Sequence, residues 1–231
     1  MGGEYIHNDR LLGKSFCFAI LLEMKALFIH RSVGHNLIVE GNLPELLGKH
    51  GIELDDYDNN SGTLTKANGS ALSNAITIPG NNTNPDNLEQ YFINWDTILD
   101  NYDLIIIKSC YPNSHIKNGD QLKKIQESYQ TIFEVFKAHR KQLILLTSPP
   151  LRPLFTNQQE ATLIGKLDEW LVGNEATYVR VLDFHALLAN SRGKHRSMLR
   201  REYRRWLPFD NHPNKKANQQ IAPLVAEFIA K

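Results

Sequence analysis

The stretch FIHRSVGHNL, residues 28–37, joins an apolar run to a group of polar and small residues. The apolar run begins at Lys25 and ends at His30, and its bulky side chains predict a short buried strand. A cation, a serine and a glycine follow at once, ahead of a segment, 36–51, that has a broken helical pattern. The stretch therefore predicts a strand that delivers Ser32 to the beginning of a helix.

The same alternation of strand and helix continues along the chain. Four more apolar runs predict buried strands, at 52–58, 103–109, 142–148 and 177–184. Helical periodicity separates or follows them, at 88–99, 122–138, 156–172 and from about 215 to 230, with Thr156 as the expected cap of the third. Strands that alternate with helices favour right-handed crossovers, so we expect one doubly wound α/β domain with a five-stranded parallel sheet between two helical layers.

Residues 24–231 are expected to form this single domain, because no repeat or long linker divides them. Residues 1–23 are interpreted as an N-terminal extension. The apolar run 15–22 follows two cations, as in a signal peptide, but charged residues follow it directly and no small-residue cleavage site is visible. The polar loop 59–87 is unusually long, and loops of this length are usually functional or disordered.

Composition narrows the function classes. The chain has 231 residues, a net charge of +1 and 42% hydrophobic residues. The near-zero net charge does not suggest that the protein as a whole binds nucleic acid or a membrane, and no nucleic-acid partner is expected. Its two cysteines provide neither a disulfide framework nor zinc-ligand spacing, and we expect no metal and no cofactor. No run is long enough to span a bilayer. A cytoplasmic location is favoured, and secretion stays open.

Ser32 is the first candidate for chemistry, because sites in such sheets lie beyond the carboxyl ends of the strands. One interpretation makes it a helix cap. In the other it is a nucleophile beside free N–H groups that could hold a developing oxyanion. Gly34 favours the second, since a glycine lets the backbone approach a ligand closely.

A nucleophilic serine needs a histidine base and a group that orients that base. The segment FDNHPN, 209–214, offers Asp210 and His212, with Pro213 able to start the last helix. The alternative is a surface histidine in a turn.

Other histidines are weaker candidates. Asp183 and His185 repeat the Asp-x-His pattern after a strand, but an apolar helical segment follows, which favours a packed His185. His30 is expected to shape the turn before Ser32, and His35 to face solvent. Spacing suggests no third ligand that would make a metal site of these two.

The stretch 192–205 has seven Lys or Arg residues and one Glu. Such a run is most often a solvated helix face, and the alternative is a patch that binds an anionic substrate or phosphate. Tyr203 is its only aromatic residue, which disfavours stacking on single-stranded nucleic acid.

The chain resembles the SGNH/GDSL hydrolase superfamily in three features taken together. They are Ser32 after the first strand, the polar segment SCYPNS (109–114) after the third, and an Asp-x-His-Pro before the last helix. The segment HRSVG is similar to its divergent His-x-Ser-x-Gly branch, where most members have Gly-Asp-Ser. The last block is Asp210-Asn211-His212, one residue shorter than the usual Asp-x-x-His.

The resemblance implies a flavodoxin-like sheet and a serine esterase. In that case Ser32 attacks an ester carbonyl, His212 is the base and Asp210 orients the base. The oxyanion hole would combine the Ser32 N–H with Gly62 and with Asn113 or Ser109 from the segment SCYPNS. We expect His30, Arg31 and Gly34 to border the substrate.

The favoured function is removal of a short acyl group from a carbohydrate or another small ester. The alternative is a catalytically silent domain of this type that binds a glycan or an anionic ligand. The sequence has no Gly-rich phosphate loop and no Gly-x-Ser-x-Gly elbow, which disfavours a nucleotide binder and the larger α/β-hydrolase fold. Oligomeric state stays open.

Overall fold

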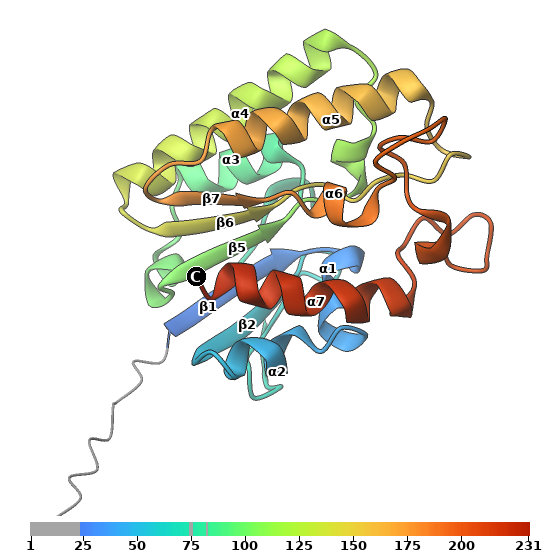
Figure 1. Ribbon diagram of the computed structural model, residues 1–231. Helices are drawn as coiled ribbons and strands as arrows, with labels where there is room; N and C mark the ends of the chain where they lie inside the picture. Colours follow the sequence, from blue (N-terminus) through green and yellow to red (C-terminus); the bar gives the residue numbers. More distant parts are fainter. Residues whose placement is uncertain (1–23, 74–75, 82) are drawn as a thin grey trace, which may run out of the picture.

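The computed structural model describes residues 24–73, 76–81 and 83–231. The expected extension 1–23, with its apolar run, lies outside the described residues. A seven-stranded sheet lies between two layers of helices (Figure 1). The three-layer α/β/α architecture is the one that the sequence predicts.

All five expected strands form, and they pair in parallel. They are β1 (Met24–His30), β2 (Ile52–Asp58), β5 (Leu104–Lys108), β6 (Gln142–Leu146) and β7 (Val179–Leu182). Every residue of β5 is buried, and the last five residues of β1 are buried as well. Strands covered on both faces are expected to be near-continuously apolar, and β5 shows this pattern.

The sheet has seven strands, so the expectation of five is incomplete. The polar loop 59–87 contributes β3 (Thr63–Thr65) and β4 (Ala71–Ser73), which pair antiparallel beyond β2. Both strands have only three residues and are largely exposed, apart from the buried Leu64. A hydrophobic pattern this short cannot be distinguished from a loop in the sequence.

Helices cover both faces of the sheet. One face carries α1 (Ser32–Val39), α2 (Leu43–Gly48), α6 (Phe184–Leu188) and α7 (Lys215–Ile229). The other face carries α3 (Pro85–Ile93), α4 (Gly119–Ala138) and α5 (Gln158–Gly173). Of the helices that the structure describes, none is both long and apolar enough to cross a membrane.

Two helix beginnings differ from expectation. Asn157, rather than Thr156, caps α5, because its side chain accepts the Glu160 N–H and the Glu160 carboxylate returns to the Asn157 N–H. Asn214 caps α7, so Pro213 lies just before the cap instead of opening the helix.

The basic stretch 192–205 is not a helix face. It is an irregular segment with isolated bridges and one short 3-10 helix, η4 (Arg201–Tyr203). Gly193 and Ser197 have positive φ angles of 79° and 60°, which a regular helix does not allow. Its cations therefore lie around a folded loop.

The sheet order is β4-β3-β2-β1-β5-β6-β7, so the chain moves outward from β1 on one side and returns to β5 on the other. The carboxyl ends of β1 and β5 form the topological switch point, where a crevice opens in such folds. Ser32 follows β1 by two residues and therefore lies at this point.

Lys108 ends β5 inside the core. Its side chain is fully buried, and the ammonium donates to the carbonyl groups of Ser109 (2.6 Å) and Thr147 (2.8 Å). It also lies 4.2 Å from the centre of the Phe184 ring. Burial lowers the pKa of Lys108 to about 7.

This lowered pKa predicts a pH-dependent stability. Between about pH 7 and pH 10 the unfolded chain still holds the Lys108 proton while the folded protein has lost it, so the free energy of unfolding should rise with pH. In urea titrations, the wild-type value minus the Lys108→Met value should increase by roughly 2–4 kcal/mol over that range. The exposed Lys66→Met variant is the control. A difference that is flat with pH would show that Lys108 is not buried in this way.

Candidate active site

Ser32 is the first residue of α1. Arg31 occupies the cap position in an extended conformation, and its side chain makes no capping bond. Ser32 is therefore not a helix cap. Because the first N–H groups of a helix lack intrahelical acceptors, its hydroxyl lies beside free donors at a positive helix end.

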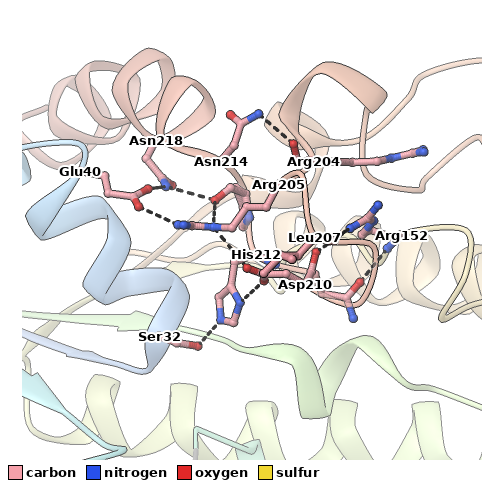
Figure 2. Close-up of polar contacts among 12 residues, drawn as sticks. Ser32, Glu40, Arg152, Arg204, Arg205, Leu207, Asp210, His212, Asn214 and Asn218 are labelled. Carbon is pink, nitrogen blue, oxygen red and sulfur yellow. Dashed lines mark hydrogen bonds and ion pairs between the residues drawn. The ribbon is translucent and has the colours of Figure 1, made fainter.

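Three side chains from distant parts of the chain form a continuous hydrogen-bonded row (Figure 2). The Ser32 hydroxyl lies 2.8 Å from His212 Nε2, across 180 residues of sequence. His212 Nδ1 lies 2.6 Å from Asp210 Oδ1. The structure thus brings together the three residues that the sequence predicted as nucleophile, base and orienting acid.

The short Asp-x-His spacing is accommodated by a local turn. Asp210 Oδ1 accepts the backbone N–H of His212 at 2.9 Å as well as the ring Nδ1–H. Burial alone would raise the pKa of Asp210, but these bonds and the nearby charges outweigh it and leave the pKa lowered. An ionised carboxylate only accepts hydrogen bonds, so the ring proton is on Nδ1 and Nε2 accepts from Ser32.

Arg205 lies behind the Asp210 carboxylate. Its Nε is 3.6 Å from Asp210 Oδ2 and donates to the Pro213 carbonyl at 3.2 Å. Its other end donates to Glu40 Oε1 at 2.7 Å, and Asn218 of α7 donates to the second oxygen of Glu40 (Figure 2). These bonds tie the loop that carries His212 to the end of α1 and to α7.

The same loop is held from its other side. Arg152 donates to the carbonyl groups of Leu207 (2.6 Å) and Asp210 (2.9 Å) (Figure 2). The Tyr111 hydroxyl donates to the Asn211 carbonyl at 2.5 Å, and burial raises the pKa of Tyr111, so the phenol stays protonated as a donor. The Tyr111 ring also meets the His212 ring edge-on at 5.5 Å.

His30 and Gly34 form the turn beneath Ser32. His30 is fully buried, and its ring contacts the Asp56 carboxylate and the Arg31 carbonyl. A Cβ on Gly34 would lie only 2.3 Å from the Cβ of His30, so Gly34 is needed for α1 to pack on this ring. His30 therefore packs beneath the turn that carries Ser32. Both residues are buried, which disfavours the expectation that His30 and Gly34 border the substrate. Arg31 lies nearer solvent, with its Nε bonded to Asn60.

The other expected oxyanion donors have protein partners. The Gly62 N–H donates to the Asp58 carbonyl at 2.9 Å in the turn after β2. The buried Asn113 amide donates to the Tyr129 hydroxyl (3.2 Å) and to Ser109 Oγ (3.4 Å), and Ser109 also contacts Tyr129. In the described part of the chain, none of these donors is hydrogen-bonded to Ser32 or His212.

The rival Asp183–His185 pair does not form. Asp183 caps α6 through the Ala186 N–H, and the buried His185 instead pairs with Asp168 at 2.5 Å. The packed interpretation of His185 is therefore confirmed. Burial raises the pKa of Asp168 to about 6. Asp168, Asp183 and His185 could present ligand atoms within 4.8 Å of one another, but the second ring nitrogen of His185 is bonded to the Ser197 carbonyl, which favours a structural ion pair.

An open hollow lies beside His212. Its volume is about 540 Å³, and most of its wall is apolar. The lining residues are Tyr111, Leu207, Phe209, Asp210, Asn211 and His212. Since His212 and Asp210 are partly exposed, a ligand in the hollow could reach the hydrogen-bonded row.

Several supporting residues gave no separate signal in the sequence. Arg205 was indistinguishable from the other cations of its basic stretch. Glu40 and Asn218 lie in ordinary helical patterns, and no spacing connects two residues 178 positions apart. Only the fold reveals these contacts.

No family model matches the chain, and no curated protein matches it in sequence. Solved structures do match. They include a GDSL-like lipase from Bacteroides thetaiotaomicron, with a TM-score of 0.57, 13% identity and coverage of 90% of this chain and 88% of that chain. A lipase/acylhydrolase from Enterococcus faecalis has a TM-score of 0.53 and 15% identity, covering 90% and 95%. An acetyl xylan esterase has a TM-score of 0.53 and 16% identity, covering 90% and 99%.

These neighbours are similar in structure to the chain over nearly its whole described length. At sequence identities of 13–16%, this likeness establishes the fold alone. Their names agree with the resemblance that the Ser32 and Asp210–His212 motifs predicted. The chain has the fold of the SGNH/GDSL hydrolases.

Proposed function

We propose that the protein is a serine esterase of the SGNH type, which hydrolyses a carboxylic ester through an acyl-enzyme on Ser32. The observation that carries the proposal is the row of contacts from Ser32 through His212 to Asp210. A serine, a histidine in the correct tautomer and a carboxylate that orients it are the elements of an activated nucleophile.

In the first half of the reaction, Ser32 Oγ attacks the carbonyl carbon while its proton moves to His212 Nε2. The Asp210 carboxylate stabilises the imidazolium that forms and does not itself take the proton. When the tetrahedral intermediate collapses, the bond to the alcohol oxygen breaks and the His212 proton moves to the leaving alcohol. The acyl group then remains on Ser32.

In the second half, water takes the place of the alcohol. His212 removes a proton from the water, the hydroxide oxygen attacks the acyl carbon, and the Ser32–acyl bond breaks. The proton returns to Ser32, and the carboxylic acid leaves. The lowered pKa of Asp210 keeps its carboxylate charged for both halves.

The Ser32 N–H is the oxyanion donor with the strongest support, because it lies at the N-terminus of α1. Asn113, Ser109 and Gly62 stay candidates that would have to exchange their present partners for the oxyanion. Loss of one such donor typically costs about a hundredfold or more in rate.

The substrate in this proposal carries a short acyl group on a carbohydrate or another small alcohol. An acetyl xylan esterase among the similar structures supports this class. The mainly apolar hollow beside His212 offers room for the acyl group or for an apolar part of the alcohol. Arg31, partly exposed beside Ser32, is the remaining candidate for a polar substrate contact.

Replacement of Ser32 or His212 by alanine should abolish this activity. We expect kcat/KM on p-nitrophenyl acetate and on acetylated sugars to fall by at least about a thousandfold in each variant, because the two residues act as one unit. The double variant should be little worse than either single variant. Ser191→Ala, at an exposed serine, is the control. Equal activity in wild type and Ser32→Ala would refute the serine mechanism, and no wild-type turnover on any ester would favour the silent binding domain.

Arg205 should act as a positioning residue for Asp210. Arg205→Gln removes the ion pair and the link to Glu40, so we expect kcat to fall about ten- to a hundredfold with KM nearly unchanged. Arg205→Lys should recover part of kcat, since it restores the charge but not the forked geometry. Arg196→Gln, an exposed cation in the same stretch, is the matched control. A change confined to KM would contradict the positioning role.

A further inference from the structure

Large apolar side chains are exposed immediately before Asp210. Trp206 is 93% exposed, Leu207 59% and Phe209 79%, and Pro208 between them is also exposed. We call residues 206–209 the apolar tip. Single exposed apolar residues are common, whereas three large ones within four positions form a patch that requires an explanation.

A second feature, which we call the basic hollow, lies in the same loop region. It has a volume of about 480 Å³ and is lined by Asn190, Arg192, Lys194, His195, Arg201 and Arg204, without a carboxylate. Within the described residues, no carboxylate lies at ion-pair distance from its four Arg and Lys side chains. The basic hollow therefore presents an excess of positive charge, of which Glu202 offsets a part at Arg204.

The tip and the hollow are neighbours. Arg152 donates to the carbonyl of Leu207 in the apolar tip, and it lies near enough to Arg204 of the basic hollow to act on its charge. Burial, followed by repulsion from Arg152 and Arg201, lowers the pKa of Arg204. Both features belong to the segment between β7 and α7, which projects beyond the carboxyl ends of the strands at the right of Figure 1.

We propose that the apolar tip and the basic hollow form one docking surface for an anionic lipid bilayer. Tryptophan and phenylalanine favour the boundary between headgroups and acyl chains. Clustered Arg and Lys side chains are attracted to the negative surface of an anionic leaflet. A dissolved polyanion would use the cations but would leave Trp206, Leu207 and Phe209 in water. The lipid surface therefore accounts for both features together.

The docking surface does not require the proposed chemistry, because neither Ser32 nor His212 belongs to it, although it shares Leu207 and Phe209 with the hollow beside His212. It does place the hollow beside His212 next to the bilayer, since Leu207 and Phe209 line that hollow and belong to the apolar tip. The overall net charge of +1 is compatible with this, as the positive charge is concentrated locally.

Binding to vesicles tests the proposal without any ester. The full chain is mixed with vesicles of phosphatidylcholine containing a third phosphatidylglycerol, and with vesicles of phosphatidylcholine alone. We expect co-sedimentation with the anionic vesicles that weakens as salt is added. We also expect a blue shift in tryptophan emission, which Trp206 would dominate because Trp95 and Trp170 are already packed against the core. Ser32→Ala should bind equally well.

Variants separate the two features of the surface. Trp206→Ser should weaken partitioning about tenfold or more, whereas Ile93→Ser, which removes an apolar residue that is 57% exposed on α3, should not. The triple variant Arg192→Gln, Lys194→Gln, Arg201→Gln removes three cations and should weaken partitioning onto anionic vesicles by about a hundredfold. The exposed lysines Lys66, Lys123 and Lys137, changed together to Gln, are the matched control.

Several outcomes would overturn the proposal. One is no binding of the wild type to anionic vesicles at low salt. Others are binding without a shift in Trp206 emission, and binding that the control variants weaken as much as the test variants. Tight binding to heparin without partitioning onto vesicles would identify the surface as a polyanion site instead.

Discussion

The Asp210 carboxylate accepts two hydrogen bonds from His212, one from its backbone and one from its ring. The first bond fixes the turn, and the second fixes the tautomer, so a spacing of one residue is enough to orient the imidazole. The contact with Ser32 depends on both. Arg205 lies behind this carboxylate, and Glu40 holds Arg205 in place. Without Arg205, the partly buried charge of Asp210 would lack a counter-ion.

Arginine has two different uses in the region between β7 and α7. Arg205, like Arg152 that follows β6, donates to carbonyl groups of the loop that carries His212, and Arg205 also donates to the Glu40 carboxylate at the end of α1. Arg192 and Arg201 line an open hollow without a carboxylate partner in the described chain. A guanidinium has five donors in a rigid fork, which suits the first use, and a permanent charge, which suits the second. One basic stretch therefore both supports the site and provides a surface.

Much of the fold was predictable because its central strands are buried on both faces and read as continuous apolar runs. The short strands β3 and β4 at one side of the sheet were not, since the three-residue segments Thr-Leu-Thr and Ala-Leu-Ser are too short to give a strand pattern. The sequence also predicted Ser32, Asp210 and His212, because each lies at a strand end or helix start where parallel sheets gather their sites. The sequence could not reveal that Arg205 contacts Glu40, 165 residues away. It also could not reveal that a side chain at Gly34 would collide with His30, so that the glycine is needed for packing and not for contact with a ligand.

The most direct test of the account is whether His212 makes Ser32 more nucleophilic than an ordinary serine. The folded protein is treated with a fluorophosphonate, and the adduct is located by peptide mass spectrometry in wild type and in His212→Ala. The account predicts a single adduct on Ser32 that is lost or greatly slowed in the variant. An unlabelled Ser32, or labelling at the same rate without His212, would contradict it.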